Sequence, residues 1–137
     1  MNRPGPATGR RENQVGGEVL GAALAVHRTL GPGLLEQVYN RALAVELEWR
    51  GLRVLREQPM PVRYRGIELE PGYFADLLVE DCVLVELKSV EILQKVHFKQ
   101  LLTYLRLSGL RLGYLINFNA PQLMDGLVRM VNGLPES

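Results

Sequence analysis

Apolar residues recur at helical spacing in the first third of the chain, and this pattern predicts two consecutive α-helices. The first covers residues 14–30 and ends at Gly31-Pro32-Gly33, and its recurring apolar residues are Val15, Val19, Ala22, Ala23, Val26 and Leu30. The second covers residues 34–50 and is followed by Gly51, which is well placed as a C-terminal cap. The apolar residues on one of its faces are Leu35, Val38, Ala42, Val45 and Trp49.

Short strand-like segments follow, separated by turn residues. They cover residues 53–57, 60–64 and 67–69, and Arg65-Gly66 supplies a turn between the last two. Residues 73–89 read Y-F-A-D-L-L-V-E-D-C-V-L-V-E-L-K-S, which is two apolar, β-branched-rich runs around a polar break. This segment predicts a β-hairpin.

The last third of the chain predicts a helix at residues 95–107, a buried strand at residues 112–118 and an amphipathic helix at residues 121–132. The apolar residues of that last helix are Leu123, Leu127, Val128 and Val131. The predicted order is therefore α-α-β-β-β-β-β-α-β-α. Because a helix crosses between the hairpin and the strand at 112–118, we expect an α/β fold with a mixed β-sheet flanked by helices.

Composition fits a single globular domain, since 137 residues with 47% hydrophobic and 23% charged positions suffice for one core and not for two. Residues 1–13 contain Pro4, Pro6 and three arginines, and they predict a flexible tail before one domain at residues 14–137. A net charge of +1 gives no global case for nucleic-acid binding, so any basic surface must be local.

The sequence also predicts a cytoplasmic protein without a membrane partner. No apolar run approaches the roughly 20 residues of a membrane span, and no secretory signal pattern opens the chain. The single cysteine, Cys82, agrees with a reducing compartment and is interpreted as an incidental thiol in the hairpin loop. Neither histidine spacing nor cysteine supply supports a zinc site.

Three charged residues lie within the apolar hairpin, where burial carries a desolvation cost. Glu86 and Lys88 are two apart on one strand, so their side chains share a face, while Val85 and Leu87 point the other way, into a core. Asp76 can join them only if the hairpin register permits it. A two-residue turn would place Asp76 opposite Val85, which is the wrong side.

A three-residue loop of Glu80, Asp81 and Cys82 would instead place Asp76 opposite Glu86. We therefore predict an odd-length loop or a bulge. Two carboxylates a few ångströms apart suit Mg²⁺, and Lys88 beside them would orient or help deprotonate an attacking water. The alternative is an edge strand with a solvated Glu/Lys face, because an E-x-K string alone is common.

Two further pairs of polar residues are placed on single helix faces. Glu36 and Tyr39 lie three apart on the second predicted helix, where Glu36 also suits the positive end of the helix dipole. Gln100 and Tyr104 lie one turn apart on the helix that follows the hairpin. Both of these could be surface residues.

Together these residues resemble the GxxExxY protein family, a branch of the PD-(D/E)XK nuclease-like superfamily. The motifs that carry the resemblance are Gly33, Glu36 and Tyr39; Asp76 with Glu86-Leu87-Lys88; and Gln100-Leu101-Leu102-Thr103-Tyr104. Ala75 stands where the superfamily name has proline. The likeness covers nearly all of the chain after the tail, from about Val15 to Val131.

The resemblance implies a restriction-endonuclease-like core and a metal site. Glu36, Asp76 and Glu86 would hold a divalent metal, with Leu87 offering its carbonyl oxygen. Lys88 would be catalytic. Tyr39, Gln100 and Tyr104 would bind substrate or support the site.

These features lead to a hypothesis of a Mg²⁺-dependent nuclease, with Mn²⁺ as a possible substitute, that hydrolyses phosphodiester bonds in DNA or RNA. The alternative is a non-catalytic module of the same fold that binds nucleic acid or assembles with itself or a partner. A third, weaker idea is a hydrolase of small phosphoesters. A chain this small has little surface for a substrate clamp, so a homo-oligomer could supply it.

Overall fold

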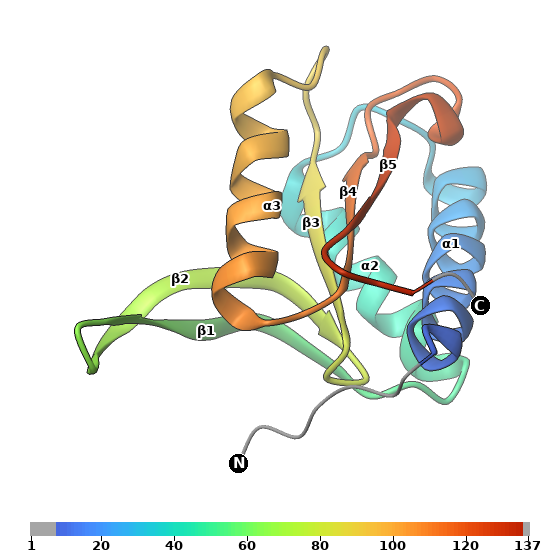
Figure 1. Ribbon diagram of the computed structural model, residues 1–137. Helices are drawn as coiled ribbons and strands as arrows, with labels where there is room; N and C mark the ends of the chain where they lie inside the picture. Colours follow the sequence, from blue (N-terminus) through green and yellow to red (C-terminus); the bar gives the residue numbers. More distant parts are fainter. Residues whose placement is uncertain (1–7, 136–137) are drawn as a thin grey trace.

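The computed structural model describes residues 8–135 and places helices on both faces of one five-stranded sheet (Figure 1). The elements are α1 (Arg10–Leu30), α2 (Glu36–Trp49), β1 (Val54–Tyr64), β2 (Ile67–Val79), β3 (Val83–Lys88), α3 (Lys95–Ser108), β4 (Leu112–Asn117), the 3-10 helix η1 (Leu123–Gly126) and β5 (Leu127–Val131). The strands lie in the order β1-β2-β3-β4-β5. Only β3 and β4 are parallel, and α3 connects them, which confirms the predicted mixed sheet flanked by helices.

Two apolar clusters hold the helices on the sheet. The cluster on the side of α1 and α2 includes Val83, Val85 and Leu87 of β3, whereas the cluster on the α3 side includes Leu84 of the same strand. Because side chains alternate along a strand, Glu86 shares the α3 side of the sheet with Leu84. The fold therefore places a carboxylate on the face that α3 covers.

The last predicted helix is wrong. Residues 121–132 form the short helix η1 and then strand β5, which pairs antiparallel with β4 from Leu112↔Val131 to Ile116↔Leu127. The segment L-V-R-M-V satisfies the open edge of β4 through backbone hydrogen bonds, and this tertiary pairing outweighs the helical spacing of its apolar residues.

The number of strands before α3 is also smaller than predicted. Residues 53–57 and 60–64 belong to one strand, β1, and residues 67–69 continue into the first strand of the predicted hairpin to form β2. The register between β1 and β2 shifts between Met60 and Val62. This irregularity accommodates Pro61 without ending the strand. Five predicted strands before α3 are thus three long ones.

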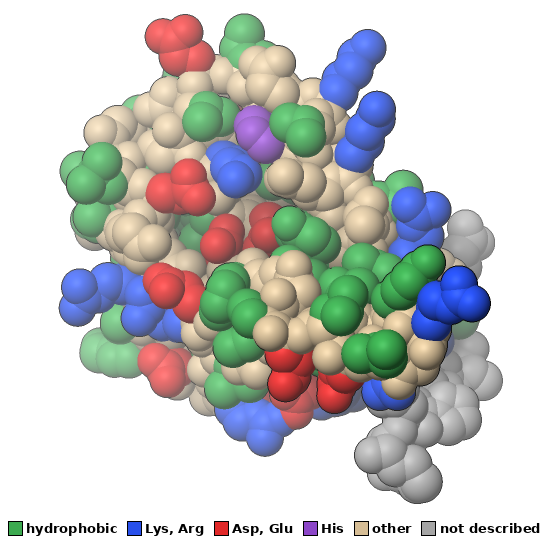
Figure 2. Space-filling view, turned by 90° about the vertical axis from the view of Figure 1, so that its left-hand side faces the viewer, with side chains coloured by type: hydrophobic (Ala, Val, Ile, Leu, Met, Phe, Trp, Pro, Cys, Tyr) green, Lys and Arg blue, Asp and Glu red, His purple; other side chains and the backbone are tan. Residues whose placement is uncertain are grey.

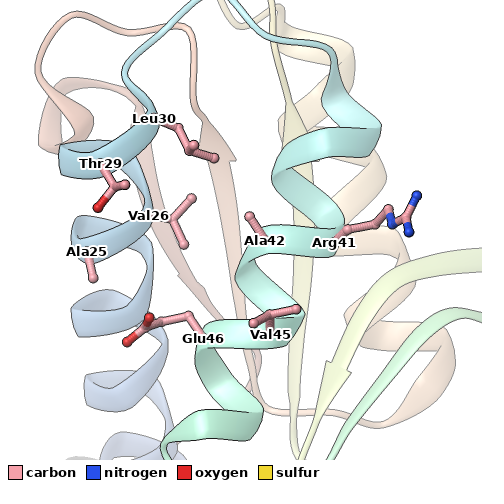
Figure 3. Close-up of a pocket in the computed structure, with 8 residues that line it drawn as sticks. All are labelled: Ala25, Val26, Thr29, Leu30, Arg41, Ala42, Val45 and Glu46. Atoms are coloured by element: carbon pink, nitrogen blue, oxygen red, sulfur yellow. The ribbon is translucent and has the colours of Figure 1, made fainter.

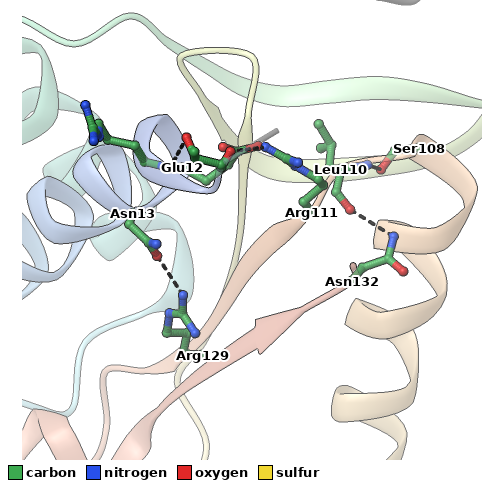
Figure 4. A network of polar contacts seen from close by, with 9 residues as sticks. Glu12, Asn13, Ser108, Leu110, Arg111, Arg129 and Asn132 are labelled. Atoms are coloured by element: carbon green, nitrogen blue, oxygen red, sulfur yellow. Dashed lines mark hydrogen bonds and ion pairs between the residues drawn. The ribbon is translucent and has the colours of Figure 1, made fainter. Parts of the chain in front are cut away.

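Helix α1 begins earlier than predicted, because tertiary contacts hold its first turn (Figure 4). The predicted tail at residues 1–13 is too long: residues 1–7 lie outside the described residues, and Arg10–Asn13 are helical. The buried Glu12 carboxylate accepts a hydrogen bond of 2.8 Å from Arg111 Nε, and Asn13 Oδ1 accepts one of 2.7 Å from Arg129 Nη2. Composition alone cannot show such long-range partners.

Helix α2 has apolar residues on two faces. Its buried face consists of Tyr39, Asn40, Leu43, Ala44 and Leu47. The predicted apolar face is mostly turned outward: Leu35, Val38, Val45 and Trp49 are exposed, with Trp49 88% exposed, and Ala42 is partly buried against the core. Within residues 8–135, no helix has the length and apolar character needed to cross a membrane.

Candidate metal-dependent active site

The β2–β3 hairpin has the register that the site requires. Val79 pairs with Val83, Leu78 with Leu84 and Leu77 with Val85, so Glu80, Asp81 and Cys82 form a three-residue loop. The predicted odd-length loop is confirmed. Glu80 and Asp81 both have positive φ, at 51° and 54°, which allows the chain to reverse over so few residues. Continuing this register places Asp76 beside Glu86.

Two backbone-to-carboxylate hydrogen bonds link β2 and β3 at Asp76 and Glu86. The Asp76 backbone N–H donates to Glu86 Oε2 at 2.8 Å, and the Leu87 backbone N–H donates to Asp76 Oδ2 at 2.8 Å. Each carboxylate therefore accepts a hydrogen bond from a backbone N–H of the opposite strand. These bonds lie where the regular β2–β3 pairing ends. Both side chains are partly buried, and Leu87 itself is fully buried in the core on the other face.

Asn40 supports the Asp76–Glu86 pair through a hydrogen bond to the Asp76 backbone. It was not among the residues predicted from the sequence. Its Nδ2 donates to the Asp76 carbonyl oxygen at 3.2 Å, while its Oδ1 accepts from Arg56 Nε at 2.7 Å. Asn40 is only 4% exposed. The available signal was its spacing, because it lies four residues after Glu36 and so on the same face of α2.

Lys88 lies at the end of β3, where the chain is fixed by the neighbouring strand. The Phe118 backbone N–H donates to the Lys88 carbonyl oxygen at 2.9 Å. Just beyond, the buried Asn117 side chain accepts from Val90 N at 3.1 Å and donates to Val90 O at 2.8 Å. The Lys88 ammonium acts electrostatically on the carboxylates of Glu36, Asp76 and Glu86. The site thus places three carboxyl groups around one ammonium group.

Tyr39 anchors the segment that leads into Glu36. Its ring is fully buried and stacks on Phe118, with ring centroids 4.6 Å apart. Its hydroxyl donates to the Gly31 carbonyl oxygen and accepts from the Leu34 backbone N–H. The structure therefore places Tyr39 in a supporting position in the core, while Glu36 begins α2 and is partly exposed toward Lys88 and Asp76.

Helix α3 brings Tyr104 to the site and leaves Gln100 on the surface. The Tyr104 ring stacks on Tyr73 with centroids 3.9 Å apart, and the Tyr73 hydroxyl donates to the Tyr104 carbonyl oxygen at 3.1 Å. Burial raises the pKa of the Tyr104 phenol, and the negative charges of Glu86 and Asp76 raise it further. The phenol is thus electrostatically coupled to the acidic pair, whereas Gln100 is exposed one turn earlier.

The pKa values of the three acidic groups of the site are all raised above their ordinary values. Burial raises the pKa of Glu86 to about 8, and repulsion by Asp76 adds to this, while the Asp76 N–H and Lys88 act against it. Burial also raises the pKa of Asp76 and of Glu36. A bound cation would relieve both the repulsion and the desolvation.

The donor set fits a hard divalent cation, although no metal cage is preformed. Within residues 8–135, no group of three His, Cys, Asp or Glu side chains has the spacing to hold a metal ion. The carboxylates instead accept backbone hydrogen bonds. Figure 2 shows acidic side chains gathered in a hollow, with basic side chains and a histidine close by. Carboxylate oxygens at such a place suit Mg²⁺ or Mn²⁺.

We expect Asn40→Ala to disturb the acidic pair. The change removes the bond to the Asp76 carbonyl oxygen and the acceptor of Arg56 Nε. The expected loss is about 1–3 kcal/mol of unfolding free energy, measured by denaturant titration. Gln37→Ala, on an exposed position of the same helix, is the matched control and should be close to neutral. Equal stability of the two variants would contradict the supporting role of Asn40.

The chain matches a known protein family. A family model described as PD-(D/E)XK nuclease superfamily matches residues 13–130, which include all of the residues placed in the site. No curated protein and no solved structure gives a match.

Proposed function

Because the chain belongs to the PD-(D/E)XK nuclease superfamily, we propose that it is a Mg²⁺-dependent nuclease that hydrolyses phosphodiester bonds in DNA or RNA. Nucleases of this superfamily generally use divalent metals and act on nucleic acids. Within the superfamily, Gly33, Glu36 and Tyr39 support assignment to the GxxExxY branch.

The observation that carries the proposal is the hydrogen-bonded Asp76–Glu86 pair beside Lys88. These two carboxylates would hold the metal, with Glu36 and the Leu87 carbonyl oxygen as further ligands. A divalent cation there would neutralise charge on the scissile phosphate and lower the pKa of a bound water.

The remaining chemistry belongs to side chains of the chain itself. The Lys88 ammonium would orient the attacking water and stabilise the negative charge that develops on the phosphorane. Tyr104 offers a phenol at the edge of the acidic pair, and Gln100 an amide at the surface of the same helix, for contacts with substrate or with Lys88. Asn40 and Tyr39 hold the elements on which these groups stand.

Metal removal is the direct test of this function. We expect the purified protein to cleave single- or double-stranded DNA or RNA in the presence of Mg²⁺ or Mn²⁺ and to lose all cleavage in excess EDTA, with recovery when metal is restored. Gel electrophoresis of end-labelled substrates measures this. Cleavage that persists unchanged in EDTA would show that the acidic pair does not act through a metal.

A second candidate is a non-catalytic nucleic-acid-binding module of the same fold. The absence of a three-ligand cluster within residues 8–135 favours it. Calorimetry distinguishes the two, because the module predicts no heat of Mg²⁺ or Mn²⁺ binding at millimolar metal, whereas the nuclease predicts saturable binding that Asp76→Asn abolishes.

A further inference from the structure

Helix α2 presents an apolar stripe to solvent on the face opposite to its core contacts. Its members are Leu35, Val38, Ala42, Val45 and Trp49, and among them Leu35, Val45 and Trp49 are 75%, 57% and 88% exposed. Isolated exposed apolar residues are common, but a row along an entire helix marks an interaction surface. The nuclease site does not use any of these side chains.

The stripe has the spacing of a coiled-coil seam. Its positions follow one another at intervals of three, four, three and four residues, which is the a/d pattern of a heptad repeat. Packing of α2 on the protein core explains its buried face but not this row of apolar residues on the other face. The small Ala42 at its centre would let another helix approach closely, between the larger side chains at each end.

A groove lies between the stripe and α1 (Figure 3). It has a volume of about 350 Å³, and its lining includes Val26 of α1 together with Arg41, Ala42 and Val45 of α2, although the Arg41 side chain points away from α1. Glu46 lies on the α1 side of the stripe, and its carboxylate accepts a hydrogen bond of 3.1 Å from Arg50 Nε. Charged side chains that pair with a second molecule must therefore lie on the opposite side of the stripe.

On that opposite side α2 carries two unpaired charges of opposite sign. Arg41, which points away from α1 in Figure 3, and Glu48 are seven residues apart and so lie on the same side of the seam. Both are exposed, and neither side chain has an ion-pair partner among residues 8–135. This pair of charges is complementary to itself under a two-fold rotation.

We propose that the outer face of α2 binds a second copy of this chain through an antiparallel helix pair. Ala42 of one copy then lies opposite Val45 of the other, and Val38 opposite Trp49. In this register Arg41 of each copy faces Glu48 of the other, twice by symmetry. An antiparallel register shifted by one seam position would instead bring the two Arg41 side chains together. A parallel helix pair would bring Arg41 to Glu46 of the other copy, but Glu46 already accepts a hydrogen bond from Arg50.

The self-association is measured on the full chain by sedimentation equilibrium and by the fluorescence of Trp49, the only tryptophan. We expect a dimer with a dissociation constant in the micromolar range or tighter. Trp49 emission should shift to shorter wavelength as the dimer forms, because the indole leaves water. A monomer at all concentrations up to about 100 µM overturns the proposal.

Charge exchange tests the partner and the register together. Arg41→Glu and Glu48→Arg are each expected to weaken the dimer by about tenfold or more, since like charges then face one another. The double variant R41E/E48R should restore the dimer to within about threefold of the parent. Arg106→Glu, on an exposed position of α3, is the matched control and should leave the dimer unchanged.

Val45→Asp provides a second arm that does not depend on the charges. It lies on the exposed face, so the fold should persist by circular dichroism while the dimer is lost. A dimer that survives Val45→Asp, or single charge variants that the double variant does not rescue, would show that another surface or another register joins the copies. This proposal does not depend on the nuclease assignment, because none of its readouts measures cleavage.

Discussion

Replacing Lys88 by alanine is expected to lower the rate of phosphodiester cleavage by about 10³-fold, with metal binding retained. The ammonium is the cation of the chain that acts on all three acidic groups of the site, and its proposed work is done on the attacking water and the developing phosphorane. Loss of this group removes stabilisation of the transition state and leaves the carboxylate oxygens in place. Single-turnover cleavage with saturating Mn²⁺ measures the effect.

Lys99→Ala is the control for this substitution, because Lys99 is an exposed lysine of α3. Its removal should change cleavage by much less than the removal of Lys88. Thermal unfolding of both variants shows whether either loses its fold. A folded Lys88→Ala variant that cleaves as fast as the parent would remove Lys88 from the mechanism.

Replacing Glu86 by glutamine is expected to abolish cleavage and, in the absence of metal, to stabilise the fold at alkaline pH. Glutamine keeps an oxygen that can accept the Asp76 N–H, but it removes a buried charge that repels Asp76. The variant should therefore lose cleavage activity but gain unfolding free energy. This is expected where a buried charge serves function and destabilises the fold.

The pH dependence of stability follows from the direction of the Glu86 shift. Burial and the charge of Asp76 raise its pKa from an ordinary value of 4.5 to about 8 in the folded protein. Between these values the folded state keeps a proton that the unfolded state has lost, so unfolding becomes easier as pH rises. The metal-free parent should lose stability from about pH 4.5 to about pH 8, by up to about 1.4 kcal/mol per pH unit.

Denaturant unfolding of the metal-free parent and of Glu86→Gln across this pH range measures the effect. The decline should be clearly shallower in the variant, because only the smaller contributions of the neighbouring acids remain. Addition of Mg²⁺ should restore stability to the parent at pH 8 and not to the variant. Parallel pH profiles for the two proteins would mean that Glu86 ionises freely in the folded state.

The approach of Asp76 to Glu86 could be predicted from the sequence because it depends on the alternation of side chains along two paired strands. Glu86 and Lys88 share a face because they are two residues apart on one strand. Since side chains alternate between the two faces of a strand, Asp76 joins them only if the hairpin loop has three residues. Glu36 is placed by the turn before α2. Each of these inferences needs only the geometry of one helix or of one hairpin between neighbouring strands, together with the rule that burying a charge carries a cost.

The remaining features depend on partners far away in the chain. Residues 127–131 have a spacing that fits a helix, and only the open edge of β4 makes them a strand. The first turn of α1 is fixed by Arg111, about a hundred positions later. Asn40 gains its role through Arg56 and the Asp76 backbone. The outer stripe of α2 looks like a core face in sequence, and only the packed structure shows that it is the other face that is buried.

The proposed nuclease requires that Asp76 and Glu86 hold a divalent cation next to Lys88. A crystal structure of the protein soaked with Mn²⁺ can test this, because the anomalous signal locates the ion. We expect a Mn²⁺ peak about 2.0–2.3 Å from a carboxylate oxygen of each acid, with the backbone hydrogen bonds to Asp76 and Glu86 rearranged to free these oxygens. A well-ordered Asp76–Glu86 pair without Mn²⁺ at millimolar concentration, or with the ion bound elsewhere, would contradict it.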